Sequence, residues 1–211
     1  MFDPLLDKMQ AAIVDKAHPK HAEVVDFVSQ HVMMAHSNHN AKAVEDACSL
    51  LLTQELSCDV LRKVNATLVA DEPDRARAAR LGTYRDEPFA YPETGRKMTT
   101  EPGNVEMQVR DVLGWAKADI LDIYELFLEL LRIHPFMDGN GRTMRLVALS
   151  EMLKSAQTPF MFRSHDDLIE FRQAFGAYLV DGQSTSAKAF AMATLEHTRP
   201  MARLTLQGLL F

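Results

Sequence analysis

The chain has 211 residues, a net charge of −6 and a hydrophobic share of 47%. This length can bury a substantial core as one domain, and the negative charge argues against a nucleic-acid-binding protein. The two cysteines show no pattern of a disulfide framework or a zinc site. No apolar run is long enough to span a membrane, and the N-terminal residues lack the layout of a signal peptide. We therefore predict a cytoplasmic protein, unless a secretion machine exports it without cleaving a signal.

Apolar residues recur at helical spacing along most of the chain, which predicts an all-α fold. The predicted helices span residues 3–16, 19–36, 41–53, 57–70, 74–81, 105–118, 119–133, 142–154, 166–179 and 186–196. We expect residues 1–56 to form an N-terminal helical extension packed on a core domain of residues 57–211. The extension holds five of the eight histidines, but no third ligand of matched spacing joins any pair, which favours helix ends or polar contacts over a metal site.

Residues 81–102 form the one long stretch without a helical period, and they are rich in glycine, proline and threonine. Two short extended runs around a turn at residues 92–95 predict a β-hairpin at about 82–102. A plain surface loop is the alternative.

The segment His134–Arg145 reads His-Pro-Phe-Met-Asp-Gly-Asn-Gly-Arg-Thr-Met-Arg and lies between two predicted helices. Its proline and glycines predict a tight loop over residues 134–141 that leads into a helix N-terminus. Free N–H groups and a partial positive charge at such a terminus favour a phosphate. Arg142 and Arg145 lie three residues apart near this positive end, so their two charges call for a negative ligand.

Two further residues of this segment carry chemistry. Asp138 offers a hard carboxylate oxygen of the kind that Mg²⁺ uses together with substrate phosphates. His134 has an ordinary pKa near neutrality, which suits it to take a proton from a hydroxyl. Each residue alone is also typical of a turn or a surface, but together they indicate transfer of a nucleotide-derived group to an alcohol.

The segment resembles the Fic motif, His-Pro-Phe-x-Asp/Glu-Gly-Asn-Gly-Arg-x-x-Arg, at every specified position. The resemblance covers residues 57–196 and implies an all-helical Fic (Fido) domain that moves AMP from Mg-ATP onto a Ser, Thr or Tyr hydroxyl of a target protein. Gly141 stands where the phosphate-transferring Doc branch has lysine, so the resemblance favours nucleotide transfer over phosphorylation. The resemblance implies that His134 is the general base, that Phe136 anchors the loop and that Asp138 binds Mg²⁺. It implies that Gly139, Asn140 and Gly141 form the anion cradle, with the Asn140 side chain on the α-phosphate. It further implies that Arg142 contacts the β-phosphate and Arg145 the γ-phosphate.

The resemblance also implies a way of binding the target and a way of control. A Fic flap, entered here by the Gly-x-Tyr-Arg-like segment Gly82–Arg85, would dock the target by strand addition. Tyr178 favours a core or rim position, with a contact on the adenine side as the alternative. The usual inhibitory helix, Ser/Thr-x-x-x-Glu-Gly/Asn, is missing from this sequence. Inhibition would then come from a separate small protein or from a variant helix at residues 41–53 that carries Glu45.

Two functional classes remain open at this point. The first is a protein adenylyltransferase that uses Mg-ATP, without nucleic-acid or membrane partners. The second is a catalytically silent binding or regulatory module on a Fic scaffold, which would have no need of the base His134. A transferase with another nucleotide or a phosphocholine donor is also compatible with the sequence, because the motif binds phosphates and makes few contacts with the nucleobase.

Overall fold

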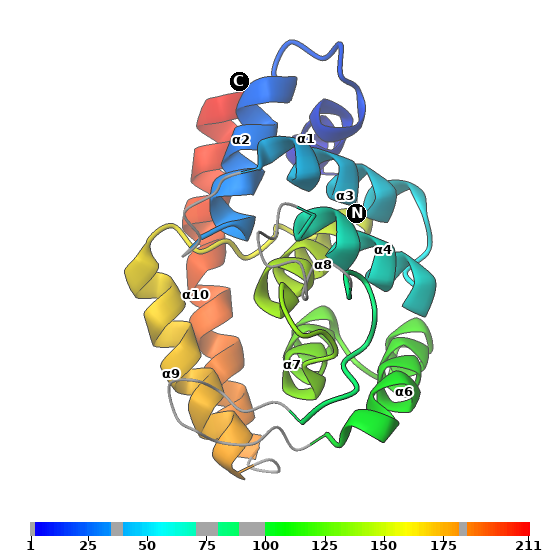
Figure 1. The fold of residues 1–211 in the computed structure, drawn as a ribbon. Coiled ribbons are helices and arrows are strands. Elements are labelled where there is room, and N and C mark those ends of the chain that lie inside the picture. Colours follow the sequence, from blue (N-terminus) through cyan, green and yellow to red (C-terminus); the bar gives the residue numbers. More distant parts are fainter. Residues whose placement is uncertain (1–2, 35–39, 71–79, 89–99, 182–184) are drawn as a thin grey trace. The chain divides into compact units, whose positions relative to one another are not determined.

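A computed structural model describes residues 3–34, 40–70, 80–88, 100–181 and 185–211 of the chain. The regular elements in these ranges are helices, with no strand among them, so the all-α prediction is confirmed (Figure 1). Contacts divide the chain into two compact units, residues 42–148 and residues 1–41 with 149–211. This division differs from the predicted one at residue 57, and the packing of an extension on a core domain stays a prediction.

The 42–148 unit contains the motif and the helices that support it. Its elements are α3 (Ala41–Thr53), α4 (Cys58–Leu68), the short η1 (Pro102–Asn104), α6 (Val105–Lys117), α7 (Ile123–Ile133) and the first part of α8 (Asn140–Lys154). Helix α6 packs on α7 and on α4. Helix α7 buries Leu126, Phe127, Leu130 and Ile133, which recur at helical spacing. Burial of one apolar face is what holds short helices of this kind in place.

Local capping sets where the helices of this unit begin. The Ser57 hydroxyl accepts a hydrogen bond from the Val60 N–H at 3.3 Å, which starts α4 close to its predicted position. Helix α7 starts later than predicted, because Asp122 and Glu125 form a capping box and Asp119 has a left-handed φ of 54°. The predicted helical stretch at residues 119–122 is therefore wrong.

Two predicted elements fall largely outside the described residues. The predicted helix at residues 74–81 is described only at Arg80 and Leu81, which form a turn. The predicted hairpin at 82–102 is described at residues 82–88 and 100–102, and no strand is seen in those two pieces. The described part of the chain also contains no helix that is long and apolar enough to cross a membrane.

The other unit is built from α1 (Pro4–Val14), α2 (His21–Val32), α9 (His165–Asp181), α10 (Thr185–Leu210) and the end of α8. Helices α9 and α10 lie side by side, and α1 packs on α2 and α10 (Figure 1). Tyr178 is buried at the end of an aromatic row that includes Phe171 and Phe175, with 6.1 Å between the Tyr178 and Phe175 rings. This is the core position that the sequence favours, and the adenine contact stays a prediction.

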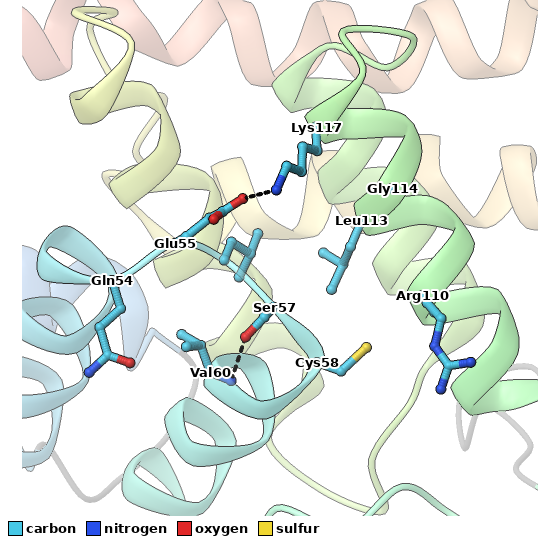
Figure 2. A pocket seen from close by; sticks show the side chains of 10 residues that line it. Gln54, Glu55, Ser57, Cys58, Val60, Arg110, Leu113, Gly114 and Lys117 are labelled. Atoms are coloured by element: carbon cyan, nitrogen blue, oxygen red, sulfur yellow. Dashed lines mark hydrogen bonds and ion pairs between the residues drawn. The ribbon is translucent and has the colours of Figure 1, made fainter.

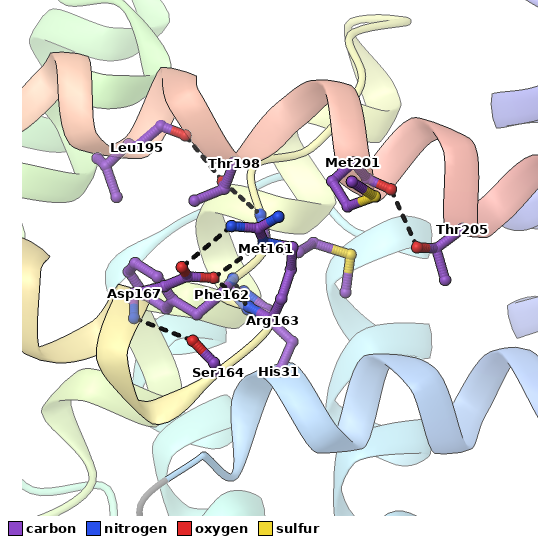
Figure 3. Close-up of polar contacts among 10 residues, drawn as sticks. All are labelled: His31, Met161, Phe162, Arg163, Ser164, Asp167, Leu195, Thr198, Met201 and Thr205. Atoms are coloured by element: carbon purple, nitrogen blue, oxygen red, sulfur yellow. Dashed lines mark hydrogen bonds and ion pairs between the residues drawn. The ribbon is translucent and has the colours of Figure 1, made fainter.

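Helix α10 continues well past its predicted end at residue 196, with Pro200 inside it. Side chains next to the proline bind the segment that precedes α9: the Thr198 hydroxyl accepts from the Met161 N–H at 3.0 Å, and Arg199 donates to the Thr158 carbonyl at 2.8 Å. Figure 3 shows the Thr198 contact, beside the bond from the Phe162 N–H to His31 of α2. These tertiary contacts outweigh the helix-breaking tendency of proline.

Candidate active site

The motif forms a tight turn between α7 and α8. Helix α7 ends at Ile133 because His134 adopts a left-handed conformation, with φ 52° and ψ 63°, in front of Pro135. Gly139 has φ +78°, which returns the chain to α8 at Asn140. A Cβ at residue 139 would lie only 2.4 Å from the Val69 side chain. The loop therefore needs a glycine here for its backbone angle and for space.

The buried side chains of Phe136 and Asn140 stabilise the turn. The Phe136 ring is 1% exposed, and its centroid lies 5.6 Å from that of the Tyr84 ring. The Asn140 carboxamide accepts from the Phe136 N–H at 2.9 Å and donates to the Phe136 carbonyl at 2.7 Å. The Asn140 side chain is thus engaged within the loop. A contact between this side chain and the α-phosphate stays a prediction.

Asp138 presents a carboxylate at the start of α8. One of its oxygens accepts from the Gly139 N–H at 2.6 Å, and the other pairs with the Arg142 guanidinium at 3.0 Å. Its side chain remains 30% exposed. The described residues contain no cluster of three or more side chains of the metal-binding types. A single accessible carboxylate fits Mg²⁺ that takes its other ligands from phosphates and water.

Two buried guanidinium groups lie in the first turns of α8. Arg142 is 9% exposed and Arg145 is 4% exposed. Besides the bond to Asp138, Arg142 reaches the Leu68 carbonyl at 3.4 Å, and its Nε has no partner among the described residues. A Cβ at residue 141 would lie 3.2 Å from the Arg145 guanidinium, so Gly141 leaves room for it. Positive charge is thereby concentrated at a helix N-terminus, where an anion is favoured.

Asn65 of α4 supports the cradle and was not predicted from the sequence. Its amide donates to the Asp138 carbonyl at 2.9 Å and to the Thr143 hydroxyl at 3.2 Å, and its oxygen accepts from the Gly82 N–H at 3.3 Å. Asn65 is 2% exposed. The only clue in the sequence is a polar residue on the apolar face of α4, next to the buried Val64. Such a residue needs hydrogen-bond partners from elsewhere in the fold.

Arg85 supports the other end of the loop. Its Nε donates to the His134 carbonyl at 2.8 Å, and its backbone N–H donates to the Pro135 carbonyl at 2.8 Å. The Arg85 side chain is 2% exposed. The sequence placed this residue only at the entry to the predicted flap.

His134 is half-buried and electrically neutral at pH 7. Burial lowers the pKa of its imidazole from 6.5 to about 4, and the nearby Arg85 charge adds to this lowering. A backbone hydrogen bond at Leu131 and the Asp138 carboxylate oppose it but are weaker. The neutral imidazole can accept a proton, as a general base must.

An open pocket of about 500 Å³ lies apart from the motif, between the segment before α4 and helix α6 (Figure 2). It is lined by Gln54, Glu55, Leu56, Ser57, Cys58, Val60, Arg110, Leu113, Gly114 and Lys117. A 2.6 Å ion pair joins Glu55 to Lys117 across it. None of the predicted site residues lines this pocket, so it is separate from the motif loop.

Comparison with known proteins shows that the segment containing this loop is similar to a known family. Residues 55–152 match the model of the Fic/DOC family. This segment of the chain is therefore similar to a Fic/DOC domain. Members of this family are typically transferases. The chain is also 30% identical over 121 residues to the protein named protein adenylyltransferase fic-1 of Caenorhabditis elegans, a match that covers 53% of this chain and 22% of that protein.

Two solved structures share the fold of this chain. A Fic domain containing signaling protein from Bacteroides thetaiotaomicron has a TM-score of 0.64 at 16% identity, and the match covers 98% of this chain and 96% of that chain. A Fic family protein from Desulfovibrio desulfuricans has a TM-score of 0.63 at 16% identity, with 96% and 67% covered. At this identity the likeness shows the fold alone, which is the helical Fic fold predicted from the motif.

Proposed function

We propose that this chain is a protein adenylyltransferase, which transfers AMP from Mg-ATP to a hydroxyl side chain of a target protein. One observation carries the proposal: a neutral imidazole, an accessible carboxylate and two buried guanidinium groups come together in one turn and the helix that follows it. The partial likeness to the adenylyltransferase of C. elegans supports the same activity. A target protein that presents a Ser, Thr or Tyr hydroxyl and a cytoplasmic location belong to this proposal as well.

His134 would act on the target hydroxyl. The hydroxyl oxygen forms a bond to the α-phosphorus of ATP, and its proton passes to the neutral imidazole. The bond between the α-phosphorus and the bridging oxygen breaks, and pyrophosphate leaves. Because the imidazole has a pKa near 4 in the nucleotide-free protein, it is ready to accept a proton at any pH near neutrality.

The start of α8 would hold the phosphates. Arg142 has an Nε donor without a partner among the described residues, and its guanidinium lies in the first turn of the helix beside the free N–H groups. We assign it to the β-phosphate, Arg145 to the γ-phosphate, and the backbone of Gly139, Asn140 and Gly141 to the cradle. Mg²⁺, held by Asp138 and the phosphates, would neutralise the negative charge of the polyphosphate.

Recognition of the target and control of the reaction are further parts of the proposal. The segment at 82–102 would dock the target by strand addition, and most of it lies outside the described residues. Inhibition would come from a separate small protein or from α3 with Glu45.

A set of labelled donors tests the proposal. The purified chain is incubated with cell lysate and Mg²⁺ plus ATP labelled on the α-phosphate, ATP labelled on the γ-phosphate, GTP, CTP, UTP or CDP-choline. Relative to lysate without the chain, we expect additional protein labelling from α-labelled ATP and no additional labelling from γ-labelled ATP. Label from the γ-phosphate would indicate phosphorylation, and label from another donor alone would indicate a different transferase. ATP binding without any label would indicate the silent regulatory module.

A further inference from the structure

Arg85 binds four carbonyl groups with one buried guanidinium. Its Nε donates to His134 at 2.8 Å, its Nη2 to Ile133 at 3.2 Å and to Thr100 at 2.5 Å, and its Nη1 to Glu87 at 3.1 Å. Among the described residues no carboxylate forms an ion pair with it. Burial lowers the pKa of its guanidinium, and the negative charge of Glu101, which forms no ion pair with it, opposes this lowering only in part. Burying a charge without a directly paired countercharge costs several kcal/mol. That cost indicates that the positions of the backbone carbonyls bound by Arg85 are important to the protein.

The position of Arg85 matches an electrostatic need of α7. The carbonyls of Ile133 and His134 lie at the C-terminal end of this helix, where the last carbonyls lack helical partners and the dipole is negative. A cation that donates to these carbonyls satisfies both needs. The planar fork of arginine carries five donors on three separate nitrogens and so reaches carbonyls that lie apart, whereas the three donors of lysine all start from one nitrogen.

These bonds hold the backbone on both sides of His134. The guanidinium binds the carbonyls of Ile133 and His134, and the Arg85 N–H binds the carbonyl of Pro135 at 2.8 Å, so three successive peptide groups are held by one residue. His134 is in a left-handed conformation, which costs about 1–2 kcal/mol for a residue with a Cβ. Loss of these bonds would remove the contacts that Arg85 makes with the carbonyl groups of residues 133 and 134.

We infer that Arg85 is a positioning residue, which sets the direction of the His134 imidazole through the backbone and does not itself touch the nucleotide. The inference rests on the proposed function, since it assumes that His134 is the base. It goes beyond that function because it makes a residue outside the motif responsible for the orientation of the base. The positive charge of Arg85 also helps to keep His134 neutral, although burial contributes more.

The test uses Arg85→Lys and Arg85→Gln, with Arg110→Lys as the matched control. Arg110 is an exposed arginine of α6, paired with Glu106 at 3.2 Å, and lies outside the motif loop. Four quantities are measured for each variant: the transfer rate at saturating Mg-ATP, the Kd for Mg-ATP, the melting curve, and the imidazole NMR signal of His134. That signal is the one, among those of eight histidines, that disappears in His134→Ala.

We expect Arg85→Lys to lower the transfer rate at saturating Mg-ATP by about 100-fold, since a displacement of about 1 Å can cost that much. The Kd for Mg-ATP should stay within about 3-fold, because the cradle is held by other residues. The His134 signal should shift, whereas Arg110→Lys should leave all four quantities unchanged. Arg85→Gln, which keeps hydrogen-bond donors but has no charge, should behave like Arg85→Lys.

Three results would overturn the inference: an unchanged rate, a rate loss fully explained by weaker ATP binding, or loss of the folded state in both Arg85 variants. If the wild-type chain transfers no AMP, the proposed function fails, and the His134 signal still tests the positioning. An unshifted signal in a folded Arg85→Lys would then contradict it.

Discussion

The two ends of the motif loop are held in different ways. At the base end, Arg85 and Asn140 bind backbone groups of residues 133–136 and leave the His134 imidazole outside these bonds. At the cradle end, the charged side chains of Asp138 and Arg142 bind each other. The base end is therefore organised before any ligand arrives. The cradle end must exchange an internal ion pair for contacts with phosphate and metal, so substitutions at the two ends should affect different measured quantities.

The largest effect should come from removing the base. His134→Ala should lower the transfer rate by about 1,000-fold or more, within the range that general-base catalysis contributes, with the Kd for Mg-ATP nearly unchanged. Labelling with α-labelled ATP and a separate binding titration measure the two quantities. The matched control is His197→Ala, an exposed histidine of α10. Retained labelling by His134→Ala would remove His134 from its role.

Gly139→Ala should damage the turn as a whole. The new Cβ would lie 2.4 Å from the Val69 side chain and 2.9 Å from the Asn65 amide, on a backbone with φ +78°. Crowding together with the left-handed conformation should cost about 2–4 kcal/mol of the free energy of unfolding. Urea unfolding measures it, and Gly103→Ala is the control because a Cβ there meets nothing within 4 Å. Equal stability of the two variants would contradict the packing described for Gly139.

Asn65→Ala should loosen the cradle end alone. It removes the donors to Asp138 and Thr143 and the acceptor for Gly82, which should cost about 1–3 kcal/mol of stability because buried polar groups lose their partners. The Kd for Mg-ATP should rise, while the rate at saturating Mg-ATP should fall less than in Arg85→Lys. Lys63→Ala, on the exposed face of α4, is the control. A selective loss of rate would show that the two ends are not independent.

Arg142→Ala and Asp138→Asn separate phosphate from metal. Arg142→Ala removes a charge-assisted contact and should weaken Mg-ATP binding about tenfold or more, equivalent to roughly 1.5–3 kcal/mol. Asp138→Asn should instead raise the Mg²⁺ concentration needed for half-maximal transfer. Titrations of ATP at fixed Mg²⁺, and of Mg²⁺ at fixed ATP, distinguish the two effects. An unchanged affinity and metal requirement in both variants would refute the site.

The smallest effect on activity should come from moderate acid. Because the folded-state pKa of His134 is about 4, its imidazole should stay neutral down to about pH 5, and transfer at pH 6 should be close to that at pH 7. In the unfolded chain the imidazole takes a proton near pH 6.5, so this group makes the free energy of unfolding fall as the pH drops from about 6.5 towards 4. NMR titration of the nucleotide-free protein measures the pKa. A midpoint near 6.5 would contradict the burial of His134.

Local features of the sequence were enough to predict the motif loop and most helices. Proline and glycine restrict backbone angles within one or two residues, and helical spacing shows within a few turns, so the turn after Ile133 and helices such as α3 were placed correctly. The residues of the motif are contiguous in the chain, so the sequence alone reveals them. The segment that matches the family model, residues 55–152, contains this motif.

Tertiary structure alone decided which residues support the loop. Arg85 reaches His134 across 49 residues of sequence, and Asn65 reaches Asp138 across 73. It also decided that α10 continues past Pro200 and that the Asn140 side chain binds Phe136. A buried polar group must find a partner wherever the fold brings one, and that partner is chosen by three-dimensional proximity, which spacing along the chain does not record.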